Sequence, residues 1–219
     1  MSEEYEYVFK VIVIGDSGVG KSNIFSRFMK NQFDRDSMTT IGVDFSSKTL
    51  KIRNEIVKAQ VWDTAGQDQF RSLAKCYYKG AIGALLVYDI SNYESFKNIE
   101  KWLAEAKDHA DEHLVTLLIG NKSDLEERRA VKIEEGMVFA KAQGFGFLET
   151  SAKNNLNVEE AFTRLLEEVF DKLEKVSNSL DTKDENDKKD GKQRLEKGEN
   201  LHLDKLNRKG KTKDGNCAC

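Results

Sequence analysis

The chain has 219 residues, a formal net charge of -3 at pH 7 and 3 cysteines. This length allows one domain, or one domain with a tail, and the slightly acidic balance argues against a general nucleic-acid binder. So few cysteines exclude a disulfide framework and suit a reducing cytosol. We expect no signal peptide, because the acidic N-terminal segment lacks a long apolar stretch. We also expect no transmembrane helix, because no segment approaches roughly 18 apolar residues.

Strand and helix patterns alternate along the chain up to about residue 174. In chain order the sequence predicts a buried strand at Tyr7–Ile14, a helix at Asn23–Lys30, strands at Phe45–Ile52 and Ile56–Asp63 joined by a tight turn, a buried strand at Ala81–Ile90, a helix between Phe96 and Ala106, a strand at Leu114–Asn121, a helix between Ile133 and Ala140, a short strand at Gly146–Thr150 and a last helix between Asn157 and Leu173. We therefore predict an α/β fold, with a mostly parallel six-stranded sheet, one antiparallel edge strand and helices on both faces. Ligands of such sheets bind at the carboxyl ends of the strands.

The chain changes character near residue 175. Residues 175–219 form a polar mixture with few apolar side chains and no Phe, Trp or Tyr. Such a segment buries too little apolar surface to offset the entropy cost of ordering the chain. We therefore expect a globular domain at residues 1–174 and a disordered tail at residues 175–219.

A glycine-rich stretch, Gly15-x-x-x-x-Gly20-Lys21-Ser22, separates the first predicted strand from the first helix. It fits the phosphate-binding loop pattern, to which the alternative is a chance glycine turn. Glycines let the main chain curl so that successive N–H groups face an anion, and the N-terminus of the following helix adds to the attraction. We expect Lys21 to reach the β- and γ-phosphates of a nucleotide, and the Ser22 hydroxyl to ligate Mg²⁺.

Two further motifs follow predicted strands. In the stretch NKSD, Asp124 can accept two hydrogen bonds from the ring N–H and the exocyclic amine of guanine, a pair of donors that adenine lacks. In the stretch DTAGQ, Asp63 is placed to hold Mg²⁺, Gly66 lets its N–H approach a γ-phosphate, and Gln67 is placed to orient an attacking water. Taken alone, NKSD is more often part of a plain loop. The alternative for DTAGQ is a plain β-turn.

These motifs resemble those of a known family. GDSGVGKS, TTIGVDF, WDTAGQ, YYKGA, LVYDIS, GNKSDL and ETSAK are similar to the motifs of Rab small GTPases in the Ras superfamily, and the resemblance covers about residues 7–173. The stretches KSNIFSRF, KAQVWDTAGQ, GALLVYDI, DHAD and GNKSDL further resemble the recycling-endosome branch, subfamily eleven. The resemblance implies a P-loop NTPase (small GTPase) fold and slow hydrolysis of GTP to GDP and phosphate. It also implies a switch that regulates vesicle and membrane trafficking, in endosomal recycling.

The resemblance also implies the roles of individual residues. Gln67 and Lys21 would be catalytic, and Ser22, Thr40 and Asp63 would ligate Mg²⁺. Phe33 and the stem of Lys122 would lie against opposite faces of the guanine. The implied nucleotide contacts are Asp16, Ser17, Gly18, Val19, Gly20, Lys21, Ser22, Asn23, Phe33, Thr40, Gly66, Asn121, Lys122, Asp124, Ser151, Ala152 and Lys153.

The implied partners are those of a regulated switch: an exchange factor, a GTPase-activating protein, effector proteins, a GDP-dissociation inhibitor and a prenylation escort protein. The ending Cys217-Ala218-Cys219 resembles the Rab Cys-x-Cys terminus, in which both cysteines carry geranylgeranyl groups. Two lipid chains anchor a protein stably where one is marginal; the alternative is a pair of reactive thiols. We expect a monomeric G domain without a nucleic-acid partner, on the cytoplasmic face of endosomal and vesicle membranes, cycling with the cytosol.

The sequence departs from the Rab pattern after Gln67. Asp68 and Gln69 stand where Rabs usually carry Glu followed by Arg or Lys. A shorter acid and a lost cation change the surface of the second switch, which bears on partner recognition and on the hydrolysis rate. A nucleotide-locked adaptor with negligible hydrolysis is therefore the alternative function. A P-loop kinase of a small molecule is disfavoured by NKSD and by the lack of an evident lid segment.

Overall fold

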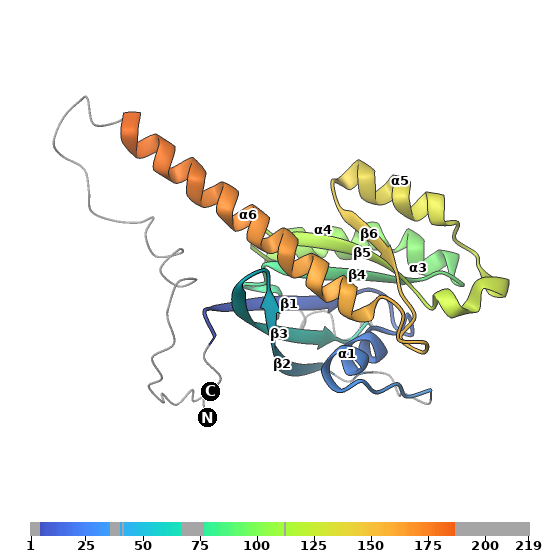
Figure 1. Cartoon of the computed structure of the whole chain (residues 1–219). Helices are drawn as coiled ribbons and strands as arrows, with labels where there is room; N and C mark the ends of the chain where they lie inside the picture. The colour runs from blue at the N-terminus through green and yellow to red at the C-terminus, as the bar shows by residue number, and fades with distance from the viewer. Residues whose placement is uncertain (1–4, 36–39, 41, 67–76, 112, 187–219) are drawn as a thin grey trace.

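A computed structural model of the chain describes residues 5–35, 40, 42–66, 77–111 and 113–186 (Figure 1). In chain order it contains β1 (Tyr7–Ile14), α1 (Lys21–Lys30), β2 (Val43–Ile52), β3 (Glu55–Thr64), β4 (Gly83–Asp89), α3 (Tyr93–Lys97), α4 (Ile99–His109), β5 (Val115–Asn121), the 3-10 helix η2 (Ser123–Arg128), α5 (Ile133–Gln143), β6 (Gly146–Glu149) and α6 (Val158–Asn186). Each predicted strand is present, with its ends shifted by at most two residues.

The strands form one six-stranded sheet in the order β2-β3-β1-β4-β5-β6. β2 pairs antiparallel with β3, and every other neighbouring pair is parallel. The predicted sheet with one antiparallel edge strand is confirmed. Because β1, β3, β4 and β5 run in the same direction, their carboxyl ends meet at one edge of the sheet, where loops from distant parts of the chain converge.

Helices cover both faces of the sheet, because the central strands are apolar on both sides. β4 is buried along its whole length, as expected of a central parallel strand. On one face α1 and α6 pack against the sheet, and the Phe28 ring stacks on the Phe162 ring with centroids 3.8 Å apart. On the other face α4 and α5 complete a second core that includes Trp102. These two cores hold the strand ends in fixed positions.

The last helix, α6, is longer than the sequence predicts. α6 continues past residue 174, where the tail was expected to begin, and ends at Asn186. Arg53, in the β2–β3 turn, pairs with Asp171 and, at 3.5 Å, with Glu174. Figure 1 shows the end of α6 projecting away from the sheet. The division into a domain and a disordered tail stays a prediction, since residues 187–219 lie outside the described part.

None of the helices in the described part of the chain is both long enough and apolar enough to cross a membrane.

Candidate functional site

A cavity of about 360 Å³ lies at the carboxyl edge of the sheet, beside the β1–α1 loop and the ends of β3 and β5. All the residues predicted to contact a nucleotide line it, except Asp16, Val19 and Ser151. Arg35 and Leu125 also line it, although the sequence analysis did not single them out. Leu125 directly follows NKSD and was therefore detectable, whereas Arg35 belongs to no motif.

The β1–α1 loop depends on glycine at two positions. At Gly15, with φ +142°, a Cβ would lie 2.1 Å from the Val87 carbonyl oxygen. At Gly20, with φ +95°, a Cβ would lie 2.4 Å from Asn121 Nδ2. Both positions need the left-handed freedom and the missing side chain of glycine. The loop can therefore pack directly on the neighbouring strands and bring the N-terminus of α1, with its unpaired N–H groups, to the cavity.

Lys21 supplies a buried cation at this end of the cavity. Its side chain is almost fully buried, and Nζ donates to the Gly15 and Asp16 carbonyl oxygens at 2.8 Å and 2.7 Å. Burial lowers the pKa of Lys21 to about 8, although the nearby carboxylates of Asp63 and Asp16 act in the opposite direction. The main-chain carbonyls thus hold the ammonium group in place beside the loop, where it can meet an anion without reorganisation.

Three oxygen-bearing side chains meet next to Lys21. Ser22 Oγ and Thr40 Oγ1 are 2.7 Å apart. Asp63 is 1% exposed, and its Oδ1 has no hydrogen-bond partner within the described residues. Burial raises the pKa of Asp63 to about 6, while hydrogen bonds from Ser22 and Thr40 lower it in part. A buried carboxylate oxygen without a donor, beside two hydroxyls, fits the hard oxygen ligands that Mg²⁺ prefers.

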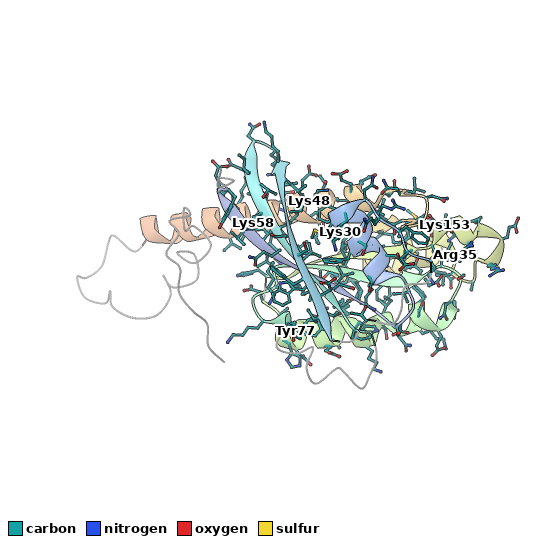
Figure 2. The ribbon with its side chains drawn as sticks, turned by 90° about the horizontal axis from the view of Figure 1, so that it is seen from below. Lys30, Arg35, Lys48, Lys58, Tyr77 and Lys153 are labelled. Carbon is teal, nitrogen blue, oxygen red and sulfur yellow. The ribbon has the colours of Figure 1, made fainter. Side chains whose placement is uncertain are left out.

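The opposite end of the cavity carries the acid of NKSD. Asp124 Oδ1 accepts a hydrogen bond from Ser151 Oγ at 2.6 Å, and Lys153 Nζ lies 3.7 Å from Asp124 Oδ2. The Asp124 side chain is only 9% exposed. Ser151 therefore does not line the cavity but donates a hydrogen bond that holds the Asp124 carboxylate in place. Figure 2 shows Lys153 near Arg35, so two cations flank the mouth of the same cavity.

Asn121 and Lys122 join the two ends of the cavity. Asn121 Nδ2 donates to the Val19 carbonyl at 2.8 Å, and Thr150 Oγ1 donates to Asn121 Oδ1 at 3.1 Å. Lys122 has φ 65°, and its Nζ lies 2.7 Å from both the Gly18 carbonyl and Asp89 Oδ2. The side chains of Asn121 and Lys122 thus bond the NKSD loop to the phosphate-binding loop. Val19 contributes its carbonyl oxygen to this link and does not line the cavity.

Asp16 does not place its carboxylate in the cavity. Oδ2 accepts a hydrogen bond from Asn98 Nδ2 at 2.8 Å, and Oδ1 accepts one from Trp102 Nε1 at 2.7 Å. The carboxylate instead fastens the loop to the start of α4. Only the main chain of Asp16, through its contact with Lys21, remains at the site.

Three predicted residues lie outside the described part of the chain: Gln67, Cys217 and Cys219. The departure at Asp68 and Gln69 also lies outside it. Their roles stay predictions.

Comparison with known proteins gives a consistent result. A model of the Ras family matches residues 10–171. The chain is 52% identical over 179 residues to the Ras-related protein RABA2a of Arabidopsis thaliana, covering 82% of each protein. It is 51% identical over 168 residues to the Ras-related protein rab-11.1 of Caenorhabditis elegans, covering 77% of this chain and 80% of the relative. It is 50% identical over 168 residues to the Ras-related protein Rab11B of Nicotiana tabacum, covering 77% of each.

Proposed function

Because the chain belongs to the Ras family and is a Rab-like GTPase, we propose that it is a GTP-dependent switch that regulates vesicle and membrane trafficking in endosomal recycling. Its relatives include proteins named Rab11, which supports the finer assignment. The proposed partners are an exchange factor, a GTPase-activating protein, effectors, a GDP-dissociation inhibitor and a prenylation escort protein. Lipids on Cys217 and Cys219 would anchor it to the membrane.

One observation carries the proposal: a single cavity joins the phosphate-binding loop to a buried acid that can read guanine. Lys21 and the N-terminus of α1 lie at one end, and Asp124 lies at the other. A phosphate-binding loop alone does not distinguish GTP from ATP. The acid adds base selection, because its acceptor oxygens are left unpaired by a base that lacks the two donors of guanine.

The chain's own groups account for binding and orientation. We assign the triphosphate to the loop amides and to Lys21, and the attacking water to Gln67. Asp63, Ser22 and Thr40 would hold Mg²⁺, which when bound supplies positive charge against the phosphate oxygens. Positioning and electrostatics of this kind perform most of phosphoryl transfer, so intrinsic turnover is expected to be slow.

Gly66 provides the conformational response. A Cβ at Gly66 would lie 2.5 Å from both the Ser17 nitrogen and Lys21 Nζ, so its main chain lies directly against the phosphate-binding loop. We propose that a γ-phosphate beside Lys21 orders the segments around Thr40 and Gly66, and that hydrolysis releases them. Effectors would bind the ordered form.

Single-turnover phosphate release tests the switch. Full-length protein loaded with γ-labelled GTP should release phosphate slowly with Mg²⁺. An activating protein that supplies an arginine should accelerate release by about 10³-fold or more. GTP that stays intact under every activator tested would contradict the switch and favour the nucleotide-locked adaptor.

The trafficking assignment has a separate test. Depleting the protein from its own cells should delay the return of internalised receptors to the cell surface and leave their uptake unchanged. Normal return after complete depletion would contradict a role in recycling without affecting the GTPase assignment.

A further inference from the structure

Arg27 lies behind the end of the cavity that holds Asp124. It is half-buried in α1 and is not one of the residues that line the cavity. Its Nε donates to the Ala152 carbonyl at 2.9 Å, and its Nη2 donates to the Lys153 carbonyl at 3.3 Å. One edge of the guanidinium thus spans two successive carbonyls of a loop that lines the cavity, a geometry that suits the fixed fork of arginine.

The remaining nitrogen of Arg27 holds the segment that leads to Phe33. Nη1 donates to the Asn31 carbonyl at 2.9 Å and to Asn31 Oδ1 at 3.1 Å. Further along, the Asp34 N–H donates to Asn23 Oδ1 at 3.0 Å. Phe33 lies between these two anchors and lines the cavity. A single side chain therefore ties two walls of this end of the cavity to α1.

The direction of these hydrogen bonds decides which way the loop amides face. In a trans peptide the carbonyl and the following N–H point to opposite sides, and no cis peptide is present in the described residues. With two successive carbonyls turned toward Arg27, the N–H groups of Lys153 and Asn154 are turned away from it. Of these two residues, Lys153 lines the cavity and Asn154 does not. The Asn154 N–H donates to Ser151 Oγ at 3.0 Å, and that hydroxyl donates to Asp124.

We propose that Arg27 is a positioning residue for guanine recognition. By holding the Ala152 carbonyl outward, it keeps the Lys153 N–H aimed at the oxygen on C6 of the base, while the Asn154 N–H supports Ser151. The inference rests on the proposed function, because it takes this end of the cavity as the guanine site. Arg27 acts through the loop and makes no contact with the nucleotide. A lysine at this position would keep the positive charge but could not donate to both carbonyls in the fixed geometry of the guanidinium.

The test separates base recognition from general stability. Full-length Arg27→Ala and Arg27→Lys are compared with the parent protein in equilibrium binding at saturating Mg²⁺. The probes are GDP, inosine diphosphate, which lacks the 2-amino group, and 6-thioguanosine diphosphate, which keeps the N1 proton and the 2-amino group but carries sulfur, a weaker acceptor, in place of the C6 oxygen. Lys30→Ala changes an exposed cation at the end of the same helix (Figure 2) and is the matched control.

We expect both Arg27 variants to bind GDP about tenfold more weakly, the effect of losing one charge-assisted hydrogen-bonded anchor. Their preference for GDP over 6-thioguanosine diphosphate should fall severalfold, because these two nucleotides differ only in the C6 acceptor. The preference for GDP over inosine diphosphate should change less, because Ser151 still donates to Asp124. Lys30→Ala should leave both ratios unchanged.

Equal weakening of all three nucleotides would overturn the inference, because that is the result of a merely structural role in α1. If Arg27→Ala does not fold, Arg27→Lys decides the matter by the same ratios. A parent protein that does not prefer GDP to ADP would instead refute the proposed function, so the two failures are distinguishable.

Discussion

Asp124 is the residue on which the choice of base depends. Its carboxylate is nearly buried, with the Ser151 hydroxyl bonded to Oδ1 and the Lys153 ammonium group 3.7 Å from Oδ2. A carboxylate has about four lone-pair sites, so acceptor capacity is left for a ligand. Removing water from such a group is unfavourable unless the ligand supplies hydrogen-bond donors. This penalty disfavours adenine, which lacks the ring N–H and amine pair that guanine presents.

Asp124→Asn should therefore change the selectivity of the site. The variant replaces one acceptor oxygen by an N–H₂ donor of nearly the same size. We expect GDP affinity to fall by about 100-fold, and preference to shift toward xanthosine diphosphate, which presents a carbonyl where guanine presents its amine. Competition against a fluorescent GDP measures both. Glu127→Gln, an exposed acid in η2, is the control; an Asp124 variant that still prefers GDP would refute the base contact.

At the scale of elements, the phosphate-binding loop is fixed from behind by α4. Asn98 immediately precedes α4, Trp102 lies on its first turn, and both donate to the Asp16 carboxylate. Hydrogen bonds to a charged acceptor are stronger than neutral ones. Two features thus set the curvature of the loop. Gly15 and Gly20 allow its backbone angles, and α4, which packs on the opposite face of the sheet from α1, holds it through Asp16.

Trp102→Phe tests this support while keeping most of the apolar packing. It removes the Nε1 donor to Asp16, and we expect GDP to dissociate about tenfold faster, with the preference for guanine over adenine unchanged. Stopped-flow displacement of a fluorescent GDP measures the rate. Trp62→Phe is the matched control, since Trp62 Nε1 has no hydrogen-bond partner among the described residues. Equal rates in the two variants would show that the Trp102 hydrogen bond does not hold the loop.

The stack of Phe28 on Phe162 joins α1 to α6 and belongs to the same scale. Both rings are buried, at 3% and 0% exposed. Phe162→Ala should lower the free energy of unfolding by about 3–5 kcal/mol, through lost apolar burial and the cavity left behind. Denaturant unfolding at fixed GDP and Mg²⁺ concentrations measures it. Val138→Ala, at a side chain in an exposed position of α5, should change stability by less than about 0.5 kcal/mol; a similar loss in both variants would contradict this packing.

At the scale of the whole molecule, the sequence predicts what local signals encode. The run AIGALLVYDI identifies β4 because a central parallel strand is apolar on both faces. The spacing of Gly15, Gly20 and Lys21 identifies the loop because the curl and the cation are built from consecutive residues. Phe33 and Thr40 required the resemblance to a family, since an isolated aromatic or threonine has no local signature.

Contacts between distant segments could not be predicted from such patterns. Arg27 and Ala152 are 125 positions apart, and Asp16 and Trp102 are 86 positions apart. The sequence therefore does not show that the Asp16 carboxylate bonds to Asn98 and Trp102. The apolar periodicity of the last helix ends at Leu173, and the weak helix formers of residues 176–179 follow soon after it. No local signal therefore predicts that α6 continues to Asn186, and the pairing of Arg53 with α6 could not be foreseen locally.

The proposed membrane anchor gives a prediction for the full-length chain. Cys217→Ser combined with Cys219→Ser removes both lipid sites, and either change alone leaves one. Because one lipid chain anchors marginally and two anchor stably, we expect the double variant to become soluble in cells and the single variants to divide between fractions. GDP affinity should stay within about twofold, because all the described residues that line the nucleotide cavity precede Asn154. Membrane fractionation with intact mass analysis measures this; a double variant that stays on membranes would contradict the anchor.

The central claim is that main-chain amides and Lys21 bind a triphosphate whose base is selected by Asp124. Mass analysis of the nucleotide released from folded, full-length protein purified with Mg²⁺ tests it most directly. The account predicts GDP or GTP in an amount equal to the protein, and no displacement by a large excess of ATP. Release of adenine nucleotides, or a protein that binds neither purine nucleotide, would contradict it.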